Sequence, residues 1–325
     1  MNTQAENQLD LTPPAVSNVS GVEVKPQRRF FPTRVQRKQL LMALLFVGPW
    51  LIGFLAFTLY PILYTIRLSF TRYDGFNNPK WIGLDNYRRF FEDGRFSQSL
   101  FNTLYYTGLA VPIGVVVAMV LALAMNQDLP EIPLYRTILY LPSVLPLFAL
   151  SFIFWALLDP NQGLINQGLR EIGFSPPNWF GDVRFAKLAI VTMAQFSAGQ
   201  IALVFLAGLK GIPQSLHEAA MIDGAGVLSR FRNITLPLMT PVILYDLILG
   251  ISGGLQVFVQ SYIITRGGPA NSTNFLVYYL YNNAFKFNGN MGYASAIGVF
   301  LFVLTFIIAI VIFRTSSRWV HYDLN

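Results

Sequence analysis

Six long apolar segments constrain this chain more than any other feature of its sequence. They cover about residues 41–66, 102–125, 137–158, 186–207, 241–263 and 292–313. A helix needs roughly 20 mostly apolar residues to cross the hydrocarbon core of a bilayer, and each segment is about that long. Hydrophobic residues make up 54% of the 325 residues, which is too many for a soluble surface. The sequence therefore predicts an all-α integral membrane protein with six transmembrane helices.

Charge and reactive side chains exclude several classes of protein. The net charge of +7 comes from basic residues at the ends of apolar segments, as in membrane proteins, so nucleic acid is not an expected partner. Cysteine is absent and the two histidines, His217 and His321, are far apart, so no metal-ligand spacing is present. No lysine precedes Ser or Thr, which excludes a phosphate-binding loop of the G-x-x-x-x-G-K-[ST] type. We expect no catalytic residue, metal site or cofactor in this chain.

The two ends of the chain set the expected orientation. Residues 1–39 are predicted to be a cytoplasmic tail, disordered up to about residue 27, with a basic cluster before the first apolar segment. That segment is too long for the apolar part of a signal peptide. Six spans in residues 40–315 then place the short C-terminus, 316–325, in the cytoplasm as well. The Lys and Arg counts of the two sides differ little, so this orientation depends mainly on the basic cluster.

A polar stretch, EAAMIDGAGVLSRFRNITLPLM at 218–239, lies between the fourth and fifth apolar segments. Ser215 and Glu218 have the spacing of a capping box, which predicts a helix that begins there. Gly224 can end that helix. The expected topology places the whole loop, about residues 208–240, in the cytoplasm.

A second short helix is predicted after the glycine bend. Apolar residues follow at i, i+4 and i+7, namely Val227, Phe231 and Ile234. Pro237 and Pro241 are expected to close this helix. The loop is therefore predicted to be helix, bend and helix.

The fifth apolar segment carries the candidate substrate residues in LQVFVQSYIIT, 255–265. In an unbroken helix, Gln256 and Gln260 share one face, and Phe258 and Tyr262 share a roughly opposite face. The glutamines are the favoured lining of a transport path, because amides that face lipid would be costly. Their spacing fits hydrogen bonds between helices equally well, and this alternative stays open. The aromatic pair can cover the apolar faces of a pyranose, although plain packing is the favoured interpretation.

The polar stretch resembles a known motif. EAAMIDGAG with the downstream Phe, Ile, Leu-Pro and Pro residues is similar to the EAA loop in membrane subunits of binding-protein-dependent ABC importers. Four further stretches resemble the maltose-type carbohydrate permeases: WIGLDNY (81–87), YRTILYLPSVLP (135–146), TRGGPANST (265–273) and MGYASAIGVFLF (291–302). The resemblance covers roughly residues 40–315 and implies the six-helix fold of a type I ABC importer permease.

This resemblance implies a function for the loop. In that family the EAA loop is the coupling element that docks into a cleft on a cytoplasmic ATPase. The matching positions in this sequence are Glu218, Ala219, Ala220, Asp223, Gly224 and Ala225. ATP and Mg are then expected in a separate ATPase subunit, and this chain is not expected to be an enzyme.

The resemblance also implies an assembly in a bacterial inner membrane. A second, related permease would form a heterodimer with this chain, with two copies of the ABC ATPase below and a solute-binding protein above. This chain would then form half of the path for a sugar or oligosaccharide.

Three other functions remain open on the sequence. A permease for glycerol phosphate or a polyol would look similar, although the cores of spans four to six lack Lys and Arg, which disfavours an anionic substrate. A secondary transporter is expected to show internal repeats and ionisable residues near the midplane, and this chain shows no clear repeat and one candidate acid, Asp246. A mere membrane anchor would lack the polar faces of spans four and five.

Overall fold

The structure is a computed structural model that describes residues 34–127, 130–287 and 289–321. The predicted disorder up to about residue 27 lies outside the described residues. The chain divides into two compact units, Met1–Thr58 and Leu59–Asn325. In the described chain, all but two of the regular elements are helical. The exceptions form an antiparallel pair of two-residue strands, β1 (Thr71–Arg72) and β2 (Lys80–Trp81).

The first apolar segment is helical from α1 (Arg34–Phe54) through a π-helical turn, η1 (Leu55–Leu59), into α2 (Tyr60–Ser69). Pro61 lies two residues beyond η1 and lacks the N–H that would donate to the carbonyl four residues earlier. A missing donor favours the local widening of a π-helical turn. The same spacing recurs later in the chain, where Pro237 follows the π-helical η2 (Phe231–Thr235).

The second unit holds three further helices that are long and apolar enough to cross a bilayer. They are α4 (Gly94–Met125), α12 (Leu236–Leu255) with the turns before it, and α14 (Met291–Ser316). Two predicted spans are instead bent pairs. The pair α5 (Ile132–Val144) and α6 (Leu147–Leu157) bends by 99°, and the pair α8 (Val183–Gln195) and α9 (Gly199–Lys210) bends by 50°. The described chain therefore has four spans, or six if each bent pair crosses once.

A proline explains the sharper bend. Pro146 restricts the residue before it, and Leu145 is extended, with φ −69° and ψ 132°. At the second bend, Gly199 begins α9 directly against the backbone of α5. A Cβ on Gly199 would lie 2.0 Å from the carbonyl oxygen of Leu139. Glycine is therefore required for this close approach.

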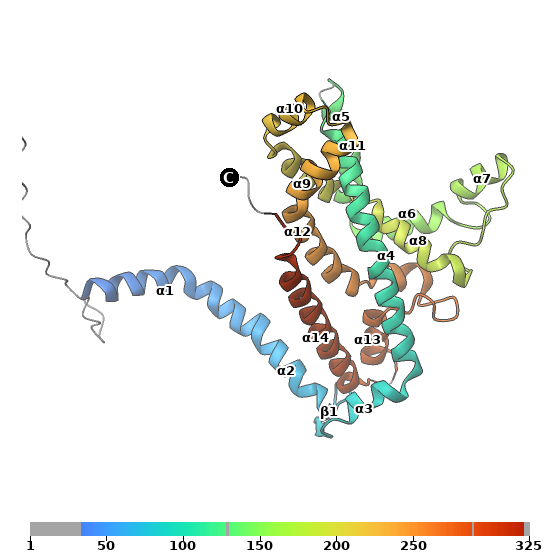
Figure 1. The fold of residues 1–325 in the computed structure, drawn as a ribbon. Helices are drawn as coiled ribbons and strands as arrows, with labels where there is room; N and C mark the ends of the chain where they lie inside the picture. Colours follow the sequence, from blue (N-terminus) through green and yellow to red (C-terminus); the bar gives the residue numbers. More distant parts are fainter. Residues whose placement is uncertain (1–33, 128–129, 288, 322–325) are drawn as a thin grey trace, which may run out of the picture. The chain divides into compact units, whose positions relative to one another are not determined.

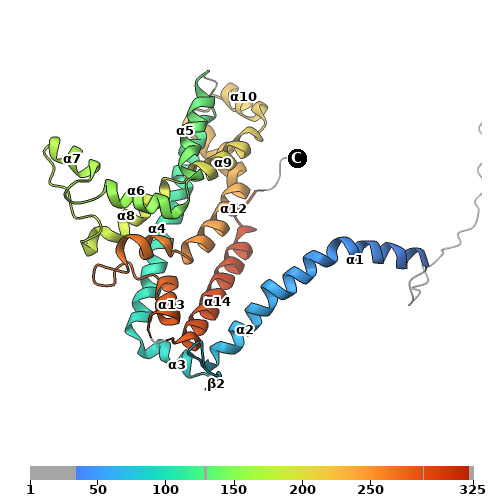
Figure 2. The same cartoon turned by 180° about the vertical axis from the view of Figure 1, so that it is seen from behind.

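Helix α4 is the centre of the second unit and packs against α8, α9, α12 and the short helix α13 (Leu276–Phe285). Helix α13 also packs against α14, as both views of the ribbon show (Figures 1 and 2). Two glycines of α12 form a seam with α4. A Cβ on Gly250 would lie 3.1 Å from Val111, and one on Gly254 would lie 2.9 Å from Thr107. Close approach of α12 to α4 therefore depends on these two glycines, whereas Gly253 has no neighbour within 4 Å among the described residues.

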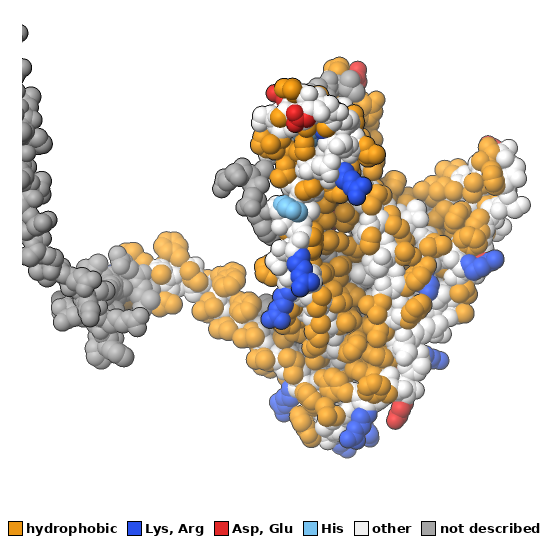
Figure 3. Space-filling model, viewed as in Figure 1, with side chains coloured by type: hydrophobic (Ala, Val, Ile, Leu, Met, Phe, Trp, Pro, Cys, Tyr) orange, Lys and Arg blue, Asp and Glu red, His pale blue; other side chains and the backbone are white. Residues whose placement is uncertain are grey.

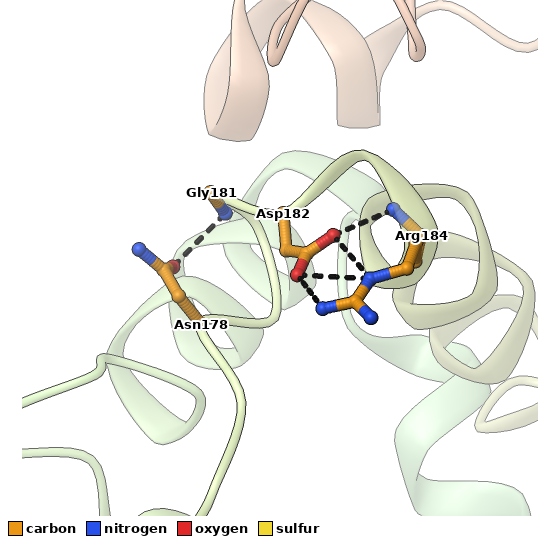
Figure 4. A network of polar contacts seen from close by, with 4 residues as sticks. All are labelled: Asn178, Gly181, Asp182 and Arg184. Atoms are coloured by element: carbon orange, nitrogen blue, oxygen red, sulfur yellow. Dashed lines mark hydrogen bonds and ion pairs between the residues drawn. The ribbon is translucent and has the colours of Figure 1, made fainter.

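Polar caps fix the ends of the bundle. Asp182 begins α8 by accepting a hydrogen bond from the backbone N–H of Arg184 at 2.9 Å and by pairing with its guanidinium at 2.7 Å (Figure 4). Just before it, Asn178 accepts from the N–H of Gly181 at 2.9 Å. Two further short helices are α3 (Asp85–Glu92), which packs against α4 and α14, and α7 (Leu164–Glu171), which packs against α6. Between the two ends, hydrophobic side chains cover most of the viewed face (Figure 3).

Candidate functional site

The predicted EAA helix is present as α10 (Gln214–Ile222), but it begins differently from the prediction. Pro213 is the N-cap residue and no side chain caps the helix. Ser215 therefore lies inside the first turn, where its side chain cannot serve as the N-cap. The predicted capping box with Glu218 is wrong, because the N-cap is Pro213, two residues before Ser215, and its fixed φ suits the start of a helix.

The end of α10 confirms the expected role of Gly224 in the backbone. This residue has φ +79°, a conformation that favours glycine. The N–H of Gly224 donates to the carbonyl of Met221 at 3.0 Å, and the N–H of Ala225 donates to that of Ala220 at 2.8 Å. These two bonds form a Schellman motif, which ends the helix and satisfies its free carbonyls.

Helix α10 presents its side chains outward. It has no buried residue, and Ile222 is 88% exposed. Glu218 and Asp223 are also exposed and form no ion pair with the described residues. Apolar and acidic side chains are therefore exposed together on α10 and at its C-terminal end.

The second helix of the loop is longer than predicted. Helix α11 (Val227–Arg230) continues through η2 into α12, and together they form one apolar helix of 29 residues from Val227 to Leu255. The predicted stop at Pro237 and Pro241 is wrong. The helix accommodates Pro237 through the π-helical turn η2 just before it, and α12 continues past Pro241. A four-residue bend thus joins α10 directly to a membrane helix.

The fifth span does not continue through the candidate substrate residues. Helix α12 ends at Leu255, where Gln256 is the C-cap, and a helical turn resumes before η3 (Ser261–Thr265). The prediction that Gln256 and Gln260 share a face of an unbroken helix is therefore wrong. The N–H groups of Gln256 and Val257 donate to the carbonyls of Gly253 and Gly254, so the last turn tightens and the chain leaves the helix axis.

The break brings candidate residues into one cavity of about 290 Å³. Its walls come from α4, the bend between α8 and α9, the second half of α12 and the break itself. The polar side chains that line it include Gln195, Asp246, Gln256 and Gln260. Lys and Arg are absent from the described residues of this lining.

Gln195 and Gln260 differ in their hydrogen bonds. Gln195 donates to the carbonyls of Ala110 at 3.2 Å and Val191 at 3.0 Å, so it ties α8 to α4. Gln260 is only 5% exposed, and its Oε1 has no hydrogen-bond partner among the described residues. A buried amide oxygen without a partner is costly, so Gln260 is the lining residue that most needs a ligand.

The two aromatic candidates differ in their relation to the cavity. Phe258 lines the cavity together with the glutamines, whereas Tyr262 does not. The two rings stack with centroids 5.3 Å apart, and Phe258 also packs against Tyr281 at 5.3 Å. The expected opposition of glutamine and aromatic faces is wrong because the segment is not one helix. Gln195 of α8 and Asp246 of α12 also line the cavity, and their only signal in the sequence is polarity inside an apolar segment.

Comparisons with known proteins agree with this architecture. Residues 111–321 match the family described as "Binding-protein-dependent transport system inner membrane component". The chain is 38% identical to the probable ABC transporter permease protein YesP of Bacillus subtilis, over 90% of this chain and 95% of that protein. It is 35% identical to the lactose transport system permease protein LacF of Rhizobium radiobacter, over 83% and 91% of the two chains.

A solved structure shows the same fold. It is the crystal structure of a bacterial ABC transporter involved in the import of the acidic polysaccharide alginate, with 26% identity and a TM-score of 0.74 over 87% of this chain and 97% of that chain. The apolar spans, the exposed α10 and the polar cavity belong to a chain with the type I permease fold. This chain therefore belongs to the family of binding-protein-dependent transport system inner membrane components, as a membrane permease of an ABC importer that works with a solute-binding protein.

Proposed function

We propose that this chain forms half of the translocation path for a neutral sugar or oligosaccharide. The observation that carries this proposal is the cavity at the end of α12, with the unpartnered buried amide of Gln260 in its wall. A carboxamide both donates and accepts hydrogen bonds, which matches the hydroxyl groups of a sugar. Phe258 lies in the same wall and offers an apolar ring to the face of a pyranose.

The charge of the lining narrows the choice among related substrates. Asp246 is the one charged residue that the structure places among the described lining residues. A phosphate or carboxylate in this cavity would meet that acid without a compensating cation. The cavity therefore fits a neutral sugar or polyol better than glycerol phosphate, and the lactose permease relative favours the sugar.

The coupling element in this proposal is α10. Its exposed Glu218, Asp223 and Ile222 would dock on a cytoplasmic ATPase that binds ATP and Mg. The bend that includes Gly224 connects α10 to the continuous helix 227–255, so a shift of the docked helix would move the wall of the cavity. Two copies of the ATPase and a second, related permease complete this assembly, in which both termini are cytoplasmic.

The test of the path compares the unpartnered glutamine with the bonded one. Gln260→Leu should lower uptake per assembled complex several-fold, because the loss of one hydrogen bond costs on the order of 1 kcal/mol. Gln195→Leu should mainly lower the yield of complex, because Gln195 binds the backbone of α4. The measurement is ATP-dependent uptake of labelled neutral disaccharides, with lactose first, into vesicles that contain the purified importer and its solute-binding protein.

Two results would contradict the proposal. Unchanged uptake per complex in Gln260→Leu and Gln256→Leu at subsaturating sugar would remove the glutamines from the path. Uptake that stops when a protonophore is added, while ATP is maintained, would point to a secondary transporter instead.

A further inference from the structure

A second cavity, of about 240 Å³, lies at the end of the bundle away from α10. Arg95, in the first turn of α4, lines it. The region of α10 instead shares a cavity with Asn126 and Gln127, which follow the last turn of α4. A helix of 32 residues is about 48 Å long, so the two cavities are far apart.

Positive charge gathers around this cavity. Its described lining includes Arg95, Arg266 and Lys286, and no Asp or Glu. The ion pairs within the described residues are Arg88 with Asp85 and Arg184 with Asp182, so none of the three cations has an acidic partner there. All three are exposed. We call these three residues, with Asn274 and Asn282, the cationic pocket.

The floor of the cationic pocket holds two buried amides with unused hydrogen-bonding capacity. Asn274 is 5% exposed and Asn282 is 8% exposed. The Oδ1 atom of each has no hydrogen-bond partner among the described residues. Because an amide can turn over, each side chain can present either its oxygen or its NH₂ group to a ligand. Buried polar atoms are seldom left unpaired, so these two amides indicate that the pocket receives a polar group.

Asp93, two residues before Arg95, lies close to the pocket, and its single negative charge is smaller than the charge of the three cations. Its carboxylate accepts hydrogen bonds from the N–H groups of Arg95 and Phe96 and from the hydroxyls of Tyr279 and Tyr293. The carboxylate of Asp93 caps α4 and does not line the cavity.

Several contacts hold the wall of the cationic pocket in place. Thr273 donates from its hydroxyl to the carbonyl of Gly268 at 2.6 Å, and Asn102 of α4 donates to the carbonyl of Asn271 at 2.8 Å. Lys286 lies over three rings, with its Nζ 5.7, 5.7 and 5.8 Å from the centroids of Tyr262, Tyr278 and Tyr281. A pocket held in this way loses little conformational entropy on binding.

We propose that the cationic pocket receives the carboxylate of an Asp or Glu side chain on the solute-binding protein as that protein docks. This inference rests on the proposed orientation, in which the end opposite α10 faces outward. The three exposed cations would draw an acidic surface toward the pocket, and the two amides would donate to the carboxylate once it is buried. A protein side chain suits the site better than the transported sugar, because the pocket is separate from the cavity at Gln260 and shares no lining residue with it.

The test measures docking rather than transport. The importer is assembled with its ATPase in lipid nanodiscs, and ATP hydrolysis is titrated with the purified solute-binding protein. Arg266→Glu and Lys286→Glu should each raise the half-saturating concentration of binding protein on the order of tenfold, with basal and maximal rates unchanged. Arg266 has no side-chain hydrogen bond or ion pair to a described residue, so its substitution does not disturb the fold.

A matched control separates the pocket from the general charge of the surface. Arg88→Glu makes the same change in net charge at an exposed arginine of α3 and should leave the half-saturating concentration within about twofold, as expected for a peripheral surface charge. An equal shift in this control, or no shift in the two pocket variants, would overturn the docking site while leaving the import function intact. A wild-type complex that does not respond to binding protein at all would contradict the proposed function itself, and the docking site with it.

Discussion

At the scale of single residues, Asp93 connects three helices. It caps α4, and its second oxygen accepts from Tyr293 of α14 at 2.7 Å and from Tyr279 of α13. Burial alone would raise the pKa of Asp93, but the hydrogen bonds from the two tyrosines and from backbone N–H groups outweigh it and hold the pKa below its usual value. A carboxyl with a lowered pKa stabilises the fold above its unfolded pKa of about 3.9, and this stabilisation is lost as pH falls through the folded value.

We predict that Asp93→Asn lowers the stability of the protein at pH 7 by on the order of 1 kcal/mol. Asparagine caps a helix as well as aspartate does, so the loss would come from the tyrosine contacts. The melting temperature of the purified protein in detergent, followed by intrinsic fluorescence, measures the effect. The difference in melting temperature between wild type and variant should become smaller below about pH 4.

The control for this prediction is Asp85→Asn, which removes an exposed carboxylate 3.6 Å from Arg88. Surface pairs of this kind contribute little, so its melting temperature should stay close to wild type. If the melting temperature of Asp93→Asn differs from that of wild type by the same amount at every pH, the charge of Asp93 is not what stabilises these contacts.

At the scale of elements, the bend after α10 depends on the backbone of Gly224. Its φ of +79° strains any residue with a side chain by roughly 1–2 kcal/mol, although the space around it is open. We predict that Gly224→Val reorients α10 and weakens retention of the ATPase during purification, while the chain still inserts. Co-purification of the two subunits measures this.

The neighbouring glycine supplies the control. Gly226 has φ −68° and open space, so Gly226→Ala should retain the ATPase. Loss of the ATPase in both variants to the same degree would show that the bend tolerates no side chain for some reason other than the conformation of Gly224.

The seam between α4 and α12 gives a second prediction for an element. A side chain at Gly254 would collide with Thr107, whereas one at Gly253 would meet nothing within 4 Å. Gly254→Val should therefore lower the yield of folded protein, and Gly253→Ala should leave that yield unchanged. Size-exclusion profiles in mild detergent distinguish the two, and equal profiles would contradict the packing of α4 on α12.

The elements also show what could be predicted from the sequence. The end of α10 was predictable because Gly224 is the residue type that a left-handed position favours. Its beginning was predicted wrongly, because the Ser215–Glu218 spacing fits a capping box although Pro213 is the N-cap. The break at Gln256 followed no proline, and the apolar run continued through it, so hydropathy gave no signal there. The cavity that this break forms could not be predicted for the same reason.

At the scale of the whole molecule, each of the six apolar segments corresponds to a helix or a bent helix pair that is long and apolar enough to cross a bilayer, because the length needed to cross is a strong physical constraint. The type I fold was predicted from the resemblance of the EAA stretch and four other segments to known permeases. The 99° and 50° bends could not be predicted from apolar length, because a bent pair and a straight span have the same hydropathy. The arrangement of the helices is the same for either orientation in the membrane, so which end faces the cytoplasm has to be measured separately.

Orientation is therefore the last prediction, and the absence of cysteine in the chain allows a direct measurement. Single cysteines replace three exposed residues: Ser229 in α11, Asp85 at the start of α3, and Asn178 in the loop before α8. If the basic cluster before the first span keeps the N-terminus inside, a membrane-impermeant maleimide should label Asp85→Cys and Asn178→Cys in intact spheroplasts. It should label Ser229→Cys only after the membrane is opened.

Complete labelling of all three in denaturant controls for reactivity. The reverse pattern would place α10 outside, where no ATPase can reach it, and would contradict both the coupling by α10 and the docking at the cationic pocket.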